Sequence, residues 1–490
     1  MSLRTTAHYK WWALSATSLG MLMAVLNGTT LLIALPTLVR ALHMSAFLSI
    51  WVLLSYMVVQ TALVLTVGRL SDIFGRKRLY VAGFLLFTAA ALAAGLAPNG
   101  VTLLVIRAIQ AIGGALVMGN ATAIVSDAFP RHQLGLALGI NSIVIALGQV
   151  LGPILGGLLI TVLPWHWVFW FNVPIGLMGS VWAWLQLKDV VAPTREPRID
   201  YAGNAAYMAG LTSLLVGVTA GGVEGWSSPI SFGAIALGVA AFGLFLAAEQ
   251  RAPYPLFSLS LFKNRLFAMG NVANLFIAMG RGAIVLLFVF YFQGGRGDSP
   301  LQAGILVIPL AIAMGVTAPL SGWIADRVGA RGPASLGALL VAVGLLGFAT
   351  TLTITSAYST IAAWMVLVGI GNGLFNSPNT SSIMNAVATN QRGVAAGTRT
   401  MLLNTGNVFS TAFVLALIAS KLPARVTMAI LSGTTGSLSP AQLGSFSEVL
   451  RLAFLIMALI ALGAACLSWL RGSARPQVQP ETQGQISRVS

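Results

Sequence analysis

The sequence predicts an all-α protein that crosses a lipid bilayer fourteen times. Of its 490 residues, 57% are hydrophobic and only 8% are charged, whereas about 25% of the residues of a soluble globular domain are charged. The apolar residues fall into runs of about 20, the length that a helix needs to cross the hydrocarbon core. A short basic turn between two such runs recurs in the second half of the chain, which is typical of transporters built from internal repeats.

The apolar runs place the fourteen spans in order along the chain. The first run, 12–35, is too long for the core of a signal peptide and is followed by no small-residue cleavage site, so we expect it to remain as a helix. The expected centres of the spans are Met23, Leu53, Phe87, Gly113, Leu147, Gly176, Leu211, Val239, Met279, Leu310, Leu340, Gly369, Phe409 and Ile460.

The basic residues predict the orientation. The formal net charge is +16, but the charges lie in short loops rather than in a compact basic domain, so we expect no nucleic-acid partner. With both termini in the cytoplasm, most of them face inward, as the positive-inside rule requires. The outer side then receives only Arg40, Arg296, Lys421, Arg425 and Arg451.

The basic turn predicts how the halves are organised. Its first copy follows the second span with Gly68, Asp72, Gly75, Arg76 and Arg78, and its second follows the tenth span with Gly322, Asp326, Arg327, Gly329 and Arg331. This spacing predicts six spans, two inserted spans and six further spans. We expect a first bundle at 1–190, linker and inserted spans at 191–255, a second bundle at 256–472 and a disordered cytoplasmic tail at 473–490.

The fifth span carries a glycine motif formed by Gly148, Gly152, Pro153, Gly156 and Gly157. Glycines four residues apart line one face of a helix and allow close packing of a neighbour. Proline removes a backbone donor and bends the helix. The motif is explained either by an ordinary packing face or by a helix that flexes or slides during transport.

Together these motifs resemble the major facilitator superfamily, and within it the fourteen-span drug/proton antiporter family. The turn at Gly68 is similar to the superfamily's loop motif, and the glycines of span five to the motif of its antiporters. Arg107 and Gln110, followed by Gly113 and Gly114, resemble its span-four motif. Further similarity lies in spans one and six, at 26–36 and 165–176.

The resemblance implies multidrug-type efflux, in which a small hydrophobic or amphiphilic compound leaves by alternating access in exchange for protons. It implies a bacterial inner membrane, coupling through Arg107 and Gln110, and no cofactor or metal. No nucleophile and base pair or histidine cluster supports an enzyme. A cytoplasmic latch would comprise Gly68, Asp72, Gly75, Arg76, Arg78, Asp326 and Arg327, unless this turn is only a topology anchor.

One departure from the family concerns the first span, where members commonly have an aspartate and this chain has Asn27. We expect the acidic residues to lie in loops or at the ends of spans, namely Asp72, Asp127, Asp189, Glu196, Asp200, Glu224, Glu249, Asp298, Asp326, Glu448 and Glu481. No carboxylate is therefore expected at mid-membrane to exchange a proton against a cationic drug.

Two arginines are expected within spans instead. Arg107 fits the span-four motif, whereas Arg281, near the middle of span nine, has no such explanation. An arginine at the bilayer centre costs about 2.5–3.5 kcal/mol, so it should face a cavity or find local carbonyl partners. A central cavity would be completed by polar residues of other spans: Asn27, Tyr56, Gln60, Asn120, Asn141, Gln149, Tyr291, Asn372, Asn376, Asn404 and Asn407.

Two alternative functions stay open. In the first, the chain exports an anionic metabolite that Arg281 and Arg107 bind. In the second, it no longer transports and serves as a membrane sensor or scaffold. Intact latch and glycine motifs favour transport, because a scaffold that does not move needs neither. The outer loop 421–446 shows no motif that would predict a periplasmic adaptor.

Overall fold

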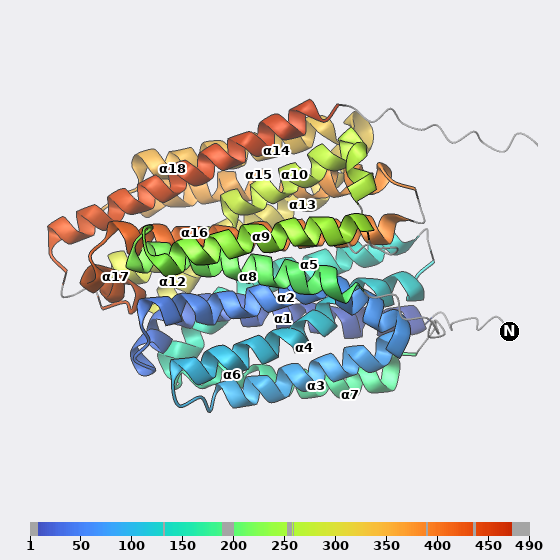
Figure 1. Ribbon diagram of the computed structural model, residues 1–490, viewed down its shortest axis with the longest axis horizontal. Coiled ribbons are helices and arrows are strands. Elements are labelled where there is room, and N and C mark those ends of the chain that lie inside the picture. Colours follow the sequence, from blue (N-terminus) through green and yellow to red (C-terminus); the bar gives the residue numbers. More distant parts are fainter. Residues whose placement is uncertain are drawn as a thin grey trace, which may run out of the picture.

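The protein is a bundle of long helices that run side by side (Figure 1). The computed structural model describes residues 8–130, 133–188, 200–251, 257, 259–388, 391–434 and 438–472. In these ranges there is no β-strand, and fourteen helical stretches are long and apolar enough to cross a membrane. The predicted fold class and number of spans are therefore confirmed. The predicted tail 473–490 and the linker residues 189–199 lie outside the described residues.

The first six spans form one half of the bundle. Here α1 packs on α5, α2 on α4, and α3 on both α4 and α7. The helices are α1 (Tyr9–Ala41), α2 (Ala46–Phe74), α3 (Arg76–Ala94), α4 (Gly100–Ala128), α5 (Leu134–Val162) and a sixth span made of α6 (Trp167–Trp170) and α7 (Asn172–Gln186).

The last six spans form the other half. Here α13 packs on α15, α14 on α15 and α18, and α10 on α16 and α18. The 3-10 turn η2 (Leu259–Lys263) precedes α10 (Arg265–Arg281), α11 (Ile284–Val289), the π-helical turn η3 (Phe290–Gly295), α12 (Pro300–Leu306), α13 (Ile308–Val328), α14 (Arg331–Thr351), α15 (Tyr358–Asn385), α16 (Arg392–Lys421), α17 (Ala424–Leu431) and α18 (Pro440–Leu470).

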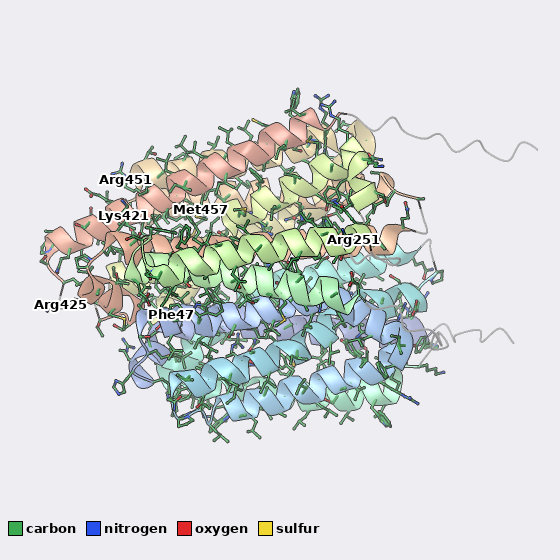
Figure 2. The ribbon with its side chains drawn as sticks, in the orientation of Figure 1. Phe47, Arg251, Lys421, Arg425, Arg451 and Met457 are labelled. Atoms are coloured by element: carbon green, nitrogen blue, oxygen red, sulfur yellow. The ribbon has the colours of Figure 1, made fainter. Side chains whose placement is uncertain are left out.

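The spans alternate in direction, so the start of α1 and the end of α18 lie at the same end of the bundle. We call this end the terminal face and the other end the opposite face. Figure 2 shows Arg425 and Lys421 at the opposite face and Arg251 toward the terminal face. This is the segregation of basic residues that the sequence predicts for them.

The repeated basic turn has the same backbone in both halves. After α2, Gly75 has φ 91°, and after α13, Gly329 has φ 83°. Only glycine adopts these left-handed values without strain. The amide of each glycine donates to a carbonyl four residues earlier, that of Ser71 or Ala325. Each glycine therefore ends one span and turns the chain into the next.

The inserted spans α8 (Tyr201–Glu224) and α9 (Pro229–Arg251) lie across the boundary between the halves (Figure 1). Toward the first half, Trp51 Nε1 of α2 donates to Thr219 Oγ1 of α8 at 3.1 Å. Toward the second, the hydroxyls of Tyr207 and Thr405 are 2.6 Å apart. Helix α9 packs on α8 and exposes large apolar side chains on its outer side. The pair thus covers the seam between α2 and α16.

Candidate functional site

A buried polar cluster lies in the first half, where α1, α2 and α4 meet. It consists of Asn27, Tyr56, Arg107 and Gln110, which are at most 4% exposed. Arg107 Nη1 donates to Gln110 Oε1 at 2.6 Å and to Asn27 Oδ1 at 3.4 Å. The guanidinium carbon lies 4.3 Å from the centroid of the Tyr56 ring. The structure thus brings together four of the residues that the sequence singled out.

The charge of Arg107 has neutral partners. Its contacts are two amide oxygens and the negative face of an aromatic ring, which attracts a cation. Arg107 Nε and Asn27 Nδ2 are buried and have no hydrogen-bond partner among the described residues. In this cluster, the amide of Asn27 occupies the place where an aspartate would form an ion pair.

A second pair of intramembrane cations lies in the other half. Arg281 ends α10, and Arg399 lies on the neighbouring helix α16. These two helices pack against each other. The sequence predicted Arg281 but not Arg399, because Arg399 follows a polar stretch at the start of its span. The sequence feature that indicates Arg399 is a second cation seven residues after Arg392, at the point where the span becomes apolar.

The other predicted cavity residues fall into two groups. Gln60, Gln149, Asn376, Asn404 and Asn407 keep part of their surface accessible, as a cavity-lining residue should. Asn120, Asn141, Tyr291 and Asn372 are enclosed by protein in this conformation.

Three of these enclosed side chains form hydrogen bonds within the protein. Asn120 Nδ2 donates to Leu116 O of its own helix at 2.8 Å. Asn141 Oδ1 accepts from Ser18 at 3.0 Å and joins α5 to α1. Tyr291 donates to Thr353 O at 2.7 Å, near the opposite face. Because these bonds join two segments or lie within one helix, these three residues do not line a cavity here.

The predicted latch contains an ion pair within the first half. Arg76, at the start of α3, pairs with Asp127 near the end of α4 and also donates to Ala123 O at 3.1 Å. Arg78 is exposed, and Arg327 stacks on Trp323 with 3.7 Å between its guanidinium carbon and the ring centroid. The side chains of Asp72 and Asp326 lie outside what the structure describes.

The second half has a different arrangement at the corresponding turn. Arg471, which follows α18, donates to Asn379 Oδ1 at 2.8 Å and to Ala330 O at 2.5 Å. Burial, together with the charge of Arg331, lowers the pKa of Arg471 to about 10, so it remains charged at neutral pH. An arginine held by an amide and a carbonyl therefore replaces the arginine–aspartate pair.

The glycine motif of α5 contacts two helices. Gly148, Gly152 and Gly156 face α1, and Thr30 Oγ1 of α1 donates to Gly152 O at 3.2 Å. Gly157 faces α12 of the other half, where an added Cβ would lie 2.5 Å from the Cα of Leu301. The motif is therefore a packing face toward α1 and, in addition, a close crossing between the two halves.

The hydrogen bonds described between the halves lie at the opposite face. Arg40 Nη1 donates to Ser432 O at 2.8 Å, and Gln293 Nε2 donates to Ile33 O at 3.0 Å. Together with the crossing of α5 and α12, these bonds hold the two halves against each other at that face.

Comparison with known proteins gives consistent matches. The family profile of the Major Facilitator Superfamily matches residues 17–411 and 272–489. The tetracenomycin C resistance and export protein of Streptomyces glaucescens is 31% identical over 84% of this chain and 76% of its own length. A riboflavin transporter of Clostridioides difficile is 30% identical over 84% of this chain and 89% of its own. The inward-facing, unoccupied structure of a bacterial homologue of the human lysosomal transporter Spinster superposes with a TM-score of 0.67 at 15% identity, covering 95% of this chain and 97% of the other.

Proposed function

The chain belongs to the major facilitator superfamily and is a multi-pass membrane transporter rather than an enzyme, and on this premise we propose that it exports small amphiphilic compounds. The export would proceed by alternating access across a bacterial inner membrane, with both termini in the cytoplasm. The relative from Streptomyces glaucescens, a resistance and export protein, supports this direction of transport.

The observation that carries the proposal is the closure of the opposite face. With cytoplasmic termini, that face would be periplasmic, so the contacts between the halves there support a conformation that is closed outside and loads substrate from inside. In the described structure the halves meet there through two hydrogen bonds, the crossing of α5 and α12, and packing of α1 and α2 against α11, α12 and α17. A hydrogen bond contributes about 1 kcal/mol net, so these two polar contacts do not by themselves lock the face shut.

Proton coupling is the finer part of the proposal. The cluster around Arg107 has no carboxylate to take up a proton. Asp127 is a described carboxylate that pairs with a motif residue, Arg76. Protonation would neutralise Asp127 and release Arg76, which supplies a coupling step at the terminal face.

The test is efflux from cells that express the full-length protein. We expect export of the cationic dye ethidium or the anionic dye carboxyfluorescein, and we expect a protonophore to stop it. Asn27→Asp places a carboxylate where Oδ1 now lies 3.4 Å from Arg107. An ion pair that can be protonated should add or strengthen export of the cation.

Asn120→Asp is the matched control, because Asn120 is also fully buried but bonds only to its own helix in the described structure. It should gain no cation export. Export of neither dye by cells that insert the protein correctly would contradict the proposed function. Efflux that persists with the protonophore would contradict proton coupling alone.

A second candidate is export of an anionic metabolite. It is favoured by Arg281, which no described acidic residue neutralises. In this case the substrate would supply the negative charge that the spans lack. Comparing export of the cationic and the anionic dye distinguishes the two candidates. The sensor or scaffold hypothesis instead requires that the opposite face never opens.

A further inference from the structure

Arg281 and Arg399 form a cationic site that the proposed cycle does not use. They lie on α10 and α16, two helices that pack closely along their length. Asn274 Nδ2 of α10 donates to Arg399 O at 3.1 Å, and the amide of Ala283 donates to Ser410 Oγ at 3.1 Å. These two bonds fix the register of the helices around the two arginines.

The two arginines lie on neighbouring helices that run in the same direction. Both α10 and α16 begin at the terminal face, and helical side chains lean toward the start of their helix. The side chain of Arg281 therefore leans toward the level of Arg399. Two guanidinium groups are therefore carried inside the spans by one pair of packed helices.

Among the described residues, neither guanidinium group has a counter-charge. The described part of the chain provides no hydrogen-bond or ion-pair partner for either side chain, and both Nε atoms are buried without a partner. By contrast, Arg107 has two amide oxygens and a ring. One arginine at mid-membrane already costs about 2.5–3.5 kcal/mol, and like charges add to that cost.

The site is open to a ligand. Arg281 and Arg399 lie deep in the protein, yet each keeps part of its surface accessible. The same two helices carry further buried polar atoms without partners among the described residues, namely Asn271 Oδ1, Asn274 Oδ1 and Thr398 Oγ1. A deep, partly accessible and unsaturated pair of cations is the arrangement that an anion would complete.

We propose that Arg281 and Arg399 bind the carboxylate of an organic anion, and that this anion is the transported substrate. Guanidinium groups present planar forks that hold a carboxylate with paired hydrogen bonds. The inference rests on the proposed export function and specifies its substrate class. It places the anion site entirely in the second half, and Arg107 then belongs only to the polar cluster of the first half.

The first test measures binding alone. Carboxyfluorescein is titrated with the purified full-length protein, and its anisotropy is followed. We expect Arg281→Gln and Arg399→Gln each to weaken binding tenfold or more. Arg425→Gln removes an exposed cation at the opposite face and should change nothing. Ethidium binding should be equal in all four proteins, because a merely structural defect would weaken both dyes.

Lysine variants control for misfolding. Arg281→Lys and Arg399→Lys keep the charge but lose the planar fork, so we expect binding to weaken severalfold. Dye binding that is unchanged in all the variants of Arg281 and Arg399 would overturn the proposal. So would equal losses for the anionic and the cationic dye.

The second test separates a substrate from an inorganic counter-ion. Proteoliposomes are loaded with carboxyfluorescein or ethidium, and chloride is exchanged for gluconate. Transport of carboxyfluorescein that fails in Arg281→Gln supports the proposal. If chloride displaces the bound dye and only ethidium is moved, the site holds an inorganic ion and the inference fails while export stands. If neither dye is moved, the export proposal fails and so does the substrate assignment, whatever the binding result.

Discussion

At the scale of single residues, the arginines within the spans of the two halves have opposite surroundings. Arg107 is enclosed with neutral partners on three helices, whereas Arg281 and Arg399 have none in the described structure. A cation whose partners are permanent stabilises one arrangement of the first half. A cation without partners is free to bind a ligand. The structural role therefore belongs to Arg107, and the binding role to the other pair.

The contact of Arg107 with Tyr56 gives the first prediction. Tyr56→Leu removes the ring that lies 4.3 Å from the guanidinium carbon, and a desolvated cation–π contact is worth about 2 kcal/mol. We expect a clear fall in thermal stability in detergent and loss of most efflux. Tyr56→Phe keeps the ring and is the matched control, so it should stay near the wild type. Equal defects in the two variants would assign the effect to the hydroxyl instead.

The ion pair of Arg76 and Asp127 gives the second prediction. Asp127→Asn imitates the protonated state, so we expect slow efflux that no longer responds to the pH on the cytoplasmic side. The pair is partly exposed, with 23% and 22% of the side chains accessible, so the loss of stability should stay near 1 kcal/mol. The double variant Arg76→Asp with Asp127→Arg should restore part of the rate.

Asp298 supplies the control for that prediction. It pairs with Arg296 at 3.5 Å near the opposite face, in a similar degree of exposure, and no transport motif contains it. Asp298→Asn should leave the rate and its pH response near those of the wild type. Efflux by Asp127→Asn that keeps a normal pH response would remove Asp127 from the coupling step.

At the scale of helices, α5 is the element that joins the two halves through backbone. Its glycines at 148, 152 and 156 fit against α1, and Gly157 approaches α12. The contact is reciprocal, because Gly304 of α12 approaches the carbonyl of Pro153. A smooth surface without side chains allows two helices to meet and to separate with little steric cost.

Gly157→Ala is the third prediction. The new methyl group would lie 2.5 Å from Leu301 Cα, too close without movement of α12. We expect the opposite face to open and efflux to fall at least tenfold, while the protein still inserts. Gly139→Ala is the control on the same helix, because its Cβ would meet nothing within 4 Å. Similar activity of the two variants would show that the crossing does not limit transport.

The sequence predicts the helices well and their faces less well. Apolar length and basic loops identify the spans, and Gly75 and Gly329 mark a repeated turn that the backbone confirms. Nearly all faces of a membrane helix are apolar, so periodicity does not say which side faces a cavity. For this reason Asn141 was grouped with the cavity although it bonds to Ser18, and Arg399 was overlooked.

At the scale of the whole molecule, the two halves repeat the same basic turn but differ in the contacts beside it. An ion pair lies beside the turn of the first half, and Arg471 bonded to Asn379 and Ala330 lies beside that of the second. The inserted helix α8 bonds to both halves at the seam. Movement of the halves must therefore open the opposite face while α8 keeps or exchanges its partners.

The last prediction tests that movement directly. Gly433 and Pro36 face each other across the halves, and a Cβ added to Gly433 would lie 3.3 Å from that of Pro36. This is close to the spacing of a disulfide. The chain has one cysteine, Cys466, so Cys466→Ala provides a background without thiols. In it, Pro36→Cys with Gly433→Cys should form a disulfide on oxidation, block efflux, and recover efflux on reduction.

The conformational equilibrium decides how fast this disulfide forms. If the opposite face opens during transport, a transported substrate should slow the cross-linking, because it populates states in which the two positions are apart. The single variants Pro36→Cys and Gly433→Cys control for damage by either substitution, and both should remain active after oxidation. Cross-linking at the same rate with and without transported dye, or full efflux by the cross-linked protein, would mean that this face does not open and would favour a membrane scaffold.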